Sequence, residues 1–267
     1  MTLDGHLHAL EARSIYIVRE AFSRLKPAGM LWSIGKDSTA LLWMVRKAFF
    51  GRAPMPLYLL DTGMELPEVY EFQRRLTEEW RLDVRNETCP PEHEMDPTLP
   101  PAARAAARKT AGLKRLLARE GLRAILVGIR RDEQGTRAKE RIFSPRDPTG
   151  AWHYRHQPLE VWDQYQTRVE AGSHVRVHPL LHWTELDIWR YTRRENIPFV
   201  SVYLARDGKR YRSIGEKNIT VPIESTAASL DEIIAELEAT RSPERAGRTM
   251  DHETEDAFER LRTSGYM

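Results

Sequence analysis

A short loop near the N-terminal end of the chain carries residue types that are well suited to chemistry. It consists of Ser33, Ile34, Gly35, Lys36, Asp37 and Ser38. An apolar run at 28–32 precedes the loop, and apolar residues at helical spacing follow it. A turn between a strand and a helix directs free backbone amides at one point, where they favour a negatively charged ligand. Lys36 adds a cation, and Ser33 and Ser38 add hydroxyl donors. Gly35 lets a ligand approach the backbone closely, so the loop predicts a phosphate-binding site.

An ordinary helix cap is the alternative interpretation of this loop, since Ser33 or Asp37 alone could satisfy the first amides of the following helix. Several ligand-competent groups share one turn, and this favours the phosphate site. The loop is not a Walker A motif, because the pattern G-x-x-x-x-G-K-[ST] is not met. The loop therefore predicts phosphate binding without identifying the nucleotide.

A second group of charged residues follows an apolar run at 124–128. It comprises Arg130, Arg131, Asp132, Glu133, Arg137, Lys139, Glu140 and Arg141. A solvated helix face is the usual explanation of such a run. Here the charges begin directly after an expected strand, and guanidinium groups bind phosphate or sulfate oxygens with two parallel hydrogen bonds. We therefore expect an anion-binding site here.

The elements that must position these groups alternate along the chain. Apolar runs predict strands at 28–32, 57–60, 84–88, 124–128 and 175–180, and amphipathic patterns predict helices at 3–25, 67–82 and 102–120. Thr184 and Ser229, each with an acidic residue three positions later, predict two further helix starts. Such alternation is typical of an α/β fold with a doubly wound, mostly parallel sheet and helices on both faces. Because ligands bind beyond the carboxyl ends of these strands, segments 33–38, 61–63 and 128–131 are expected to converge.

Composition restricts the class of protein. The chain has 267 residues and a formal net charge of +2, so no overall field attracts nucleic acid. No apolar run approaches the ~18 residues of a membrane span. The single cysteine, Cys89, excludes an intrachain disulfide. We expect a cytoplasmic enzyme with neither a nucleic-acid nor a membrane partner, and we leave open whether it forms a homo-oligomer.

The loop at 33–38 resembles the SGGxDS pyrophosphate loop of the N-type ATP pyrophosphatases, which split ATP between its α and β phosphates. Within that superfamily the chain resembles the PAPS reductase-like branch, and in particular the small, ATP-binding subunits of bacterial sulfate adenylyltransferases. The resemblance covers nearly the whole chain. It also rests on Leu60-Asp61-Thr62-Gly63, Arg130-Arg131-Asp132-Glu133, Arg137-Ala138-Lys139-Glu140-Arg141, Trp183-Thr184-Glu185, Pro243-Glu244-Arg245 and Gly265-Tyr266.

The resemblance implies a fold, a reaction and a partner. The fold is that of the adenine nucleotide alpha hydrolases, with residues 1–200 as the nucleotide-binding domain and 201–267 as an irregular C-terminal extension over the active site. The reaction transfers AMP from ATP to sulfate, with Mg²⁺, and gives adenosine 5'-phosphosulfate and pyrophosphate. Because its equilibrium is unfavourable, a GTPase large subunit couples GTP hydrolysis to it.

The resemblance also implies roles for individual residues. Asp61 and Thr62 would lie near the adenosine, and Gly128 would let the adenosine or the α-phosphate approach the end of its strand. Asp37 would help to hold Mg²⁺. The β and γ phosphates would bind to Ser33, Ile34, Gly35, Lys36, Asp37 and Ser38. Sulfate binding or stabilisation of the transition state would fall to Lys36, Arg130, Arg131, Arg137 and Lys139.

Two departures from the family leave the acceptor open. Glu216 stands where the family usually has a cysteine, and segment 203–211 is shorter than usual. The C-terminal tail has no cysteine, so reduction of a sulfonucleotide through an enzyme thiolate is not expected. One alternative is a related enzyme that adenylates an organic or nucleobase carbonyl oxygen for replacement by sulfur or nitrogen. Another is a nucleotide-binding subunit without turnover, although a pure scaffold has no need of Lys36, Asp37 and Arg130 together.

Overall fold

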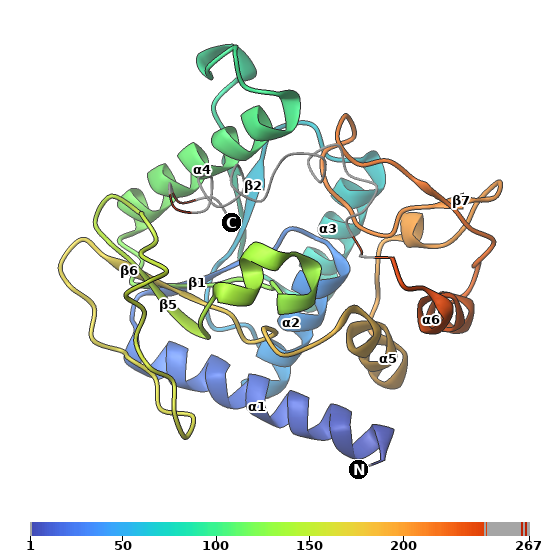
Figure 1. The fold of residues 1–267 in the computed structure, drawn as a ribbon, viewed down its shortest axis with the longest axis horizontal. Coiled ribbons are helices and arrows are strands. Elements are labelled where there is room, and N and C mark those ends of the chain that lie inside the picture. Colours follow the sequence, from blue (N-terminus) through green and yellow to red (C-terminus); the bar gives the residue numbers. More distant parts are fainter. Residues whose placement is uncertain (1, 243, 245–262, 264, 266–267) are drawn as a thin grey trace.

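The computed structural model of this chain describes residues 2–242, 244, 263 and 265 (Figure 1). Three residues that contribute to the family resemblance, Pro243, Arg245 and Tyr266, lie outside the described residues. The helices are α1 (Leu3–Arg24), α2 (Lys36–Ala48), α3 (Pro67–Trp80), α4 (Pro101–Glu120), α5 (Glu185–Glu195) and α6 (Leu230–Ala239). The short 3-10 helices are η1 (Glu92–Glu94), η2 (Arg131–Glu133), η3 (Gly135–Lys139) and η4 (Ser201–Tyr203).

A six-stranded sheet forms the centre of the molecule, and its strand order is β3-β2-β1-β4-β6-β5. Its strands are β1 (Ala28–Leu31), β2 (Leu57–Asp61), β3 (Val84–Thr88), β4 (Ala124–Leu126), β5 (Phe143–Arg146) and β6 (His174–Val177). All neighbouring pairs are parallel except β5 and β6, which are antiparallel. A separate pair consists of β7 (Lys209–Arg210) and β8 (Ile223–Glu224). The predicted α/β fold with a mostly parallel sheet is therefore confirmed.

The strand order reverses at β1, because β2 pairs with one edge of this strand and β4 pairs with its other edge. Loops that leave the carboxyl ends of β1 and β4 must diverge from one another, and this opens a crevice between them. The predicted phosphate loop follows β1, and the arginine-rich segment follows β4. The topology alone thus brings the two groups to one end of the sheet.

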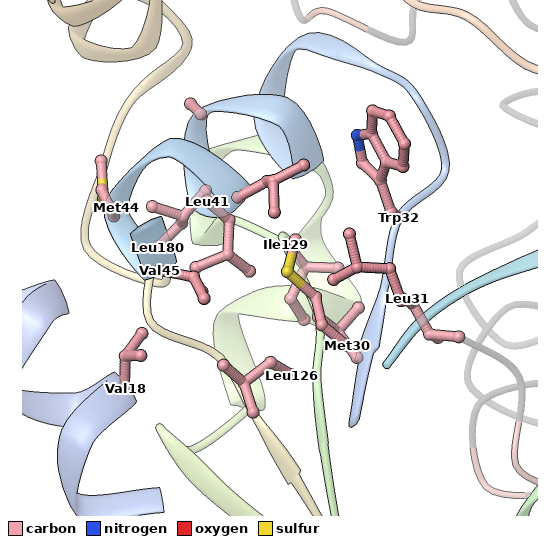
Figure 2. Packing of buried hydrophobic residues seen from close by; sticks show 14 of the residues in the cluster. Val18, Met30, Leu31, Trp32, Leu41, Met44, Val45, Leu126, Ile129 and Leu180 are labelled. Atoms are coloured by element: carbon pink, nitrogen blue, oxygen red, sulfur yellow. The ribbon is translucent and has the colours of Figure 1, made fainter. Parts of the chain in front are cut away.

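The hydrophobic core fills the space between the sheet and its helices. In Figure 1, α1 and α2 lie below the sheet and α4 lies above it, so both faces are covered and the residues of β1 are all buried. Figure 2 shows Met30 of β1 on the side of the sheet that faces Leu41 and Val45 of α2, in one cluster with Leu126 of β4. The first turns of α2, which belong to the site, are therefore fixed by the core.

Both predicted capping boxes are confirmed. The Thr184 hydroxyl accepts a hydrogen bond from the Asp187 amide at 3.1 Å, and α5 begins one residue after Thr184. Ser229 and Glu232 form the same arrangement at the start of α6. In the part of the chain that the structure describes, no helix has the length and apolar character needed to cross a membrane.

Candidate nucleotide-binding site

A cavity of about 190 Å³ lies at the carboxyl ends of β1 and β4. Its walls come from segments that are far apart in the sequence: the predicted loop, the residues after β4, the segment of η2 and η3, and the region after α5. They comprise Leu31, Ser33, Gly35, Lys36, Asp37, Ser38, Lys109, Val127, Gly128, Ile129, Glu133, Arg137, Tyr203, Ser213, Ile214, Gly215 and Glu244. The structure thus brings the phosphate loop and Gly128 together, and residues 61–63 do not line this cavity.

A larger cavity of about 670 Å³ lies at the opposite end of the sheet, next to Arg123 before β4 and His174 at the start of β6. Parallel α/β sheets bind ligands at the carboxyl ends of their strands. None of the described segments that line the larger cavity joins the carboxyl end of a parallel strand to a helix as 33–38 does, so topology favours the smaller cavity as the site.

The phosphate loop has the geometry of a ligand-binding turn. Gly35 is the N-cap of α2 and makes no side-chain capping hydrogen bond. The Ser33 hydroxyl instead donates to the Ser38 hydroxyl at 3.1 Å, so the explanation of the loop as an ordinary helix cap is wrong. Ile34 has a φ of 64°, in the left-handed region that β-branched residues rarely adopt. Backbone strain of this kind is concentrated at ligand-binding sites.

Lys36 places a permanent positive charge at the start of α2. Its side chain is 1% exposed, its Nζ lies 3.2 Å from an Asp37 oxygen, and it is also paired with Glu244. Burial lowers the pKa of the ammonium group, but the charges of Asp37 and Glu244 outweigh burial and raise this pKa above its usual value. Its backbone amide donates to the buried Tyr203 hydroxyl at 2.9 Å, which fixes the first turn of the helix.

Arg130 provides a second buried cation, which contacts Asp37 and Glu244 in the wall of the cavity. Its guanidinium group is paired with Asp37, with Asp132 at 2.9 Å and with Glu244 at 2.5 Å. Its backbone amide donates to the Glu133 carboxylate at 2.7 Å, which holds the start of η2. Burial opposes the charged form, but the four neighbouring carboxylates raise the pKa of Arg130 well above its usual value. Lys36 and Arg130 thus hold two fixed positive charges around the same two carboxylates, Asp37 and Glu244, and this charge arrangement suits an anion.

The remaining charged residues of the predicted anion site do not share one cavity. Arg137 lines the cavity and is paired with Glu133. Arg131 turns the other way, where its guanidinium lies 2.9 Å from His182 Nδ1 in a separate cavity. Lys139 is exposed, with its Nζ 5.2 Å from the centre of the Tyr154 ring. The roles predicted for Arg131 and Lys139 therefore stay predictions, and neither residue lines the cavity that contains Lys36.

Asp61 and Thr62 lie at the end of β2, one strand away from the switch point. The Asp61 carboxylate accepts hydrogen bonds from the Tyr70 hydroxyl and the Gly63 amide, both at 2.7 Å. The Thr62 carbonyl accepts a hydrogen bond from Arg108 at 2.9 Å. These contacts make a rigid turn outside the cavity, so the placement of both residues near an adenosine stays a prediction.

Sequence reasoning assigned no role to several residues of this site. Tyr203 reaches Lys36 from η4, and Glu244 reaches it from the C-terminal region. The Glu216 side chain is 2% exposed and has an oxygen 3.7 Å from Lys109 Nζ. These contacts span long stretches of sequence, so no local pattern could reveal them. The family resemblance had drawn attention to two of them: Glu244 belongs to its Pro-Glu-Arg run, and Glu216 replaces the usual cysteine.

Gly128 is needed for close packing between the end of β4 and the phosphate loop. A Cβ atom at this position would lie 3.1 Å from both the Cα and the amide nitrogen of Ser38. We expect Gly128→Ala to lower the free energy of unfolding by about 1–3 kcal/mol, because the start of α2 would have to move. Urea unfolding measures this loss, with Gly5→Ala in the first turn of α1 as the control. Equal stabilities of the two variants would contradict the prediction.

Fold and site together define an α/β protein with a loop suited to phosphate binding at the switch point of a mostly parallel sheet. The chain belongs to the phosphoadenosine phosphosulfate reductase domain family, whose model matches residues 27–222. This agrees with the family resemblance and with the expected adenine nucleotide alpha hydrolase-like fold.

Two relatives match the chain over nearly its whole length. It is 37% identical to sulfate adenylyltransferase subunit 2 of Stutzerimonas stutzeri and 38% identical to the protein of that name from Pseudoalteromonas translucida. Each alignment covers 98% of both chains. Among solved structures, the FMN adenylyltransferase of Candida glabrata aligns with a TM-score of 0.58 and 16% identity, over 83% of this chain and 65% of that one. That likeness supports the fold.

Proposed function

We propose that this chain is the ATP-binding subunit of a sulfate adenylyltransferase, which transfers AMP from ATP to sulfate. The observation that carries the proposal is the pair of buried cations, Lys36 and Arg130, at the start of α2 and beside the end of β4. They occur in a chain that is 37% identical, over 98% of its length, to a protein named sulfate adenylyltransferase subunit 2.

In the proposed reaction a sulfate oxygen attacks the α-phosphorus of ATP. The bond from that phosphorus to the bridging oxygen of the β-phosphate breaks, and pyrophosphate leaves with the electron pair. The amides at 33–38 other than that of Lys36, which donates to Tyr203, bind the β and γ phosphates together with the Lys36 ammonium. Charge that develops on the phosphate oxygens in the transition state is stabilised by Arg130 and Arg137. No proton transfer is required, because sulfate and ATP both react as anions.

Mg²⁺ is the expected companion of ATP, and Asp37 is the carboxylate placed to contribute to its binding. Among the described residues, no group of three or more His, Cys, Asp or Glu side chains could hold a metal ion by itself. Mg²⁺ is commonly bound by one or two carboxylates together with substrate phosphates, and Asp37 at the mouth of the loop fits that requirement. When bound there, the ion would neutralise phosphate charge.

A large subunit is the expected protein partner. Relatives of this chain are named as subunit 2, and a second subunit is implied by that name. We propose that this partner is a GTPase whose hydrolysis of GTP drives the unfavourable transfer of AMP to sulfate.

Pyrophosphate release tests the proposal. The purified chain is incubated with ATP, Mg²⁺ and sulfate, with and without the large subunit, and both pyrophosphate and adenosine 5'-phosphosulfate are measured. Release that depends on sulfate, and increases with the large subunit and GTP, is the expected result. Release only with an organic or nucleobase acceptor would contradict it and favour the carbonyl-adenylating alternative. ATP binding without release with any acceptor would favour a subunit that has no turnover of its own.

A further inference from the structure

Glu244 places a carboxylate between the two cations of the site. One of its oxygens contacts Lys36 Nζ, and the other lies 2.5 Å from Arg130 Nη2. Its side chain is only 5% exposed. The residue lies more than a hundred positions from either cation in the sequence, so this is a long-range tertiary contact.

The contacts of Glu244 are those that an oxyanion ligand would make. An ammonium group and a guanidinium group that bind separate oxygens of one anion are typical of phosphate and sulfate recognition. The same Lys36 is the cation of the phosphate loop, and Glu244 itself lines the cavity. The carboxylate therefore lies where a phosphate group of ATP would have to bind.

The local charges explain why Glu244 is held there. Lys36 and Arg130 are both buried, and buried cations are costly unless anions neutralise them. Asp37 contacts both cations, and Glu244 supplies the second negative charge. Burial raises the pKa of the Glu244 carboxyl, but the charges of Lys36 and Arg130 outweigh it and hold this pKa well below its usual range. The carboxylate is thus ionised at neutral pH.

Other acidic groups also face the cations. Asp132 is paired with Arg130, Glu133 accepts the Arg130 amide, and Glu185 is paired with Arg212 at 2.8 Å. With Glu244 in place, the negative charges of Asp37 and Glu244 balance the positive charges of Lys36 and Arg130. No net positive charge then remains to attract a second anion. The phosphates of ATP carry more negative charge than one carboxylate, so they can replace Glu244 but are not expected to bind beside it.

We propose that Glu244 is an internal competitor of ATP: it neutralises Lys36 and Arg130 when no nucleotide is bound, leaves them when a phosphate group binds, and returns as pyrophosphate departs. This inference rests on the proposed function, because it assigns the two cations to the phosphates of ATP. It predicts that the Glu244 charge weakens the binding of both ATP and pyrophosphate.

Binding measurements on Glu244→Gln test the competition. The amide keeps the size of the side chain and removes its charge. We expect calorimetric Kd values for ATP with Mg²⁺, and for inorganic pyrophosphate, to fall by about tenfold or more, since a unit charge a few ångströms away no longer opposes the ligand. Glu238→Gln is the matched control, because Glu238 pairs with Arg190 at the surface of α6 and is 49% exposed. Its Kd values should equal those of the wild type.

A fluorescent label follows the displacement in a chain that retains Glu244, so the test does not depend on the folding of the Gln variant. Ser242 is exposed, and its carbonyl accepts a hydrogen bond from Arg212 at 3.0 Å. Cys89 is buried, so a label on Ser242→Cys is selective. We expect pyrophosphate to change the fluorescence saturably, with a midpoint equal to the calorimetric Kd, and we expect a smaller change when Glu244→Gln is added.

The outcomes separate the two proposals. Unchanged binding by Glu244→Gln would show that the Glu244 charge does not oppose the ligand, and weaker binding would show that Glu244 supports the bound state. Either result would overturn the competition. Ligand binding without any change of fluorescence would overturn it as well, because Glu244 would then stay in place. If wild type and both Gln variants bind neither ATP nor pyrophosphate, the proposed function itself fails, and the inference fails with it.

Discussion

Replacing Lys36 with methionine is expected to lower kcat/KM for sulfate-dependent pyrophosphate release by at least about 10²-fold. Methionine is unbranched like lysine and only one atom shorter, and it removes the charge and the hydrogen-bond donors of the ammonium group. Lys36 is the first residue of α2, so its ammonium group reinforces the free amides of the loop. Lys36 stabilises charge that develops on the phosphates, so its removal costs more interaction energy in the transition state than in the bound substrate. We therefore expect kcat to fall together with kcat/KM.

Arg131→Met is the matched control for this experiment. It also removes one cation from the predicted anion site, but the Arg131 guanidinium contacts His182 in a separate cavity. We expect it to reduce kcat/KM by less than about tenfold, because no contact with the reacting phosphate is lost. Thermal unfolding of both variants checks that they fold. Near-wild-type activity of Lys36→Met would show that the site is assigned wrongly, and a larger loss in Arg131→Met would place the chemistry in the other cavity.

The central parallel strands could be predicted from the sequence because they are buried on both faces. Strands such as β1 and β4 consist of continuous apolar runs, and helices cover both sides of them. β5 was missed for an equally physical reason. Its sequence, Phe-Ser-Pro-Arg, contains a proline and lacks regular alternation. Proline is tolerated at a sheet edge, and β5 is the outermost strand next to β6.

The candidate site could be predicted only where its residues are contiguous. The loop at 33–38 works as one turn, so neighbours in sequence are neighbours in space. The arginine-rich segment forms two short 3-10 helices instead of one regular element. Arg130 therefore contacts Asp37 and Glu244 of the site, whereas the next residue, Arg131, lines a separate cavity. Residue type and spacing do not determine this difference. Tyr203 and Glu244 reach the loop through tertiary contacts that have no local pattern.

Glu140, from the charged run, has a structural role that the sequence did not indicate. Glu140 and Arg146 form an ion pair at 2.8 Å, and both side chains are completely buried. Arg146 also donates to the Ser144 hydroxyl at 2.7 Å, and its guanidinium lies 5.3 Å from the centre of the Trp152 ring. The pair joins the end of η3 to the edge strand β5. It therefore holds η3 in place, and η3 contains Arg137, which lines the cavity.

Arg146→Leu is therefore expected to lower the free energy of unfolding by about 3–5 kcal/mol, because the Glu140 charge would remain buried without this partner. Replacing both residues with leucine should recover most of the loss, since apolar side chains often substitute for a buried ion pair at little cost. Urea unfolding of the two single variants and the double variant gives the coupling energy.

Arg85→Leu is the control for Arg146→Leu, because the Arg85–Glu120 pair at 2.9 Å is largely exposed on the Arg85 side. A change within about 1 kcal/mol is expected there. If the double variant is no more stable than Arg146→Leu, the loss comes from the other contacts of the guanidinium and not from an isolated Glu140 charge. If the double variant recovers its stability, its rate of pyrophosphate release can also be measured. A rate below that of the wild type would show that the ion pair is needed for η3 to hold Arg137 in the cavity.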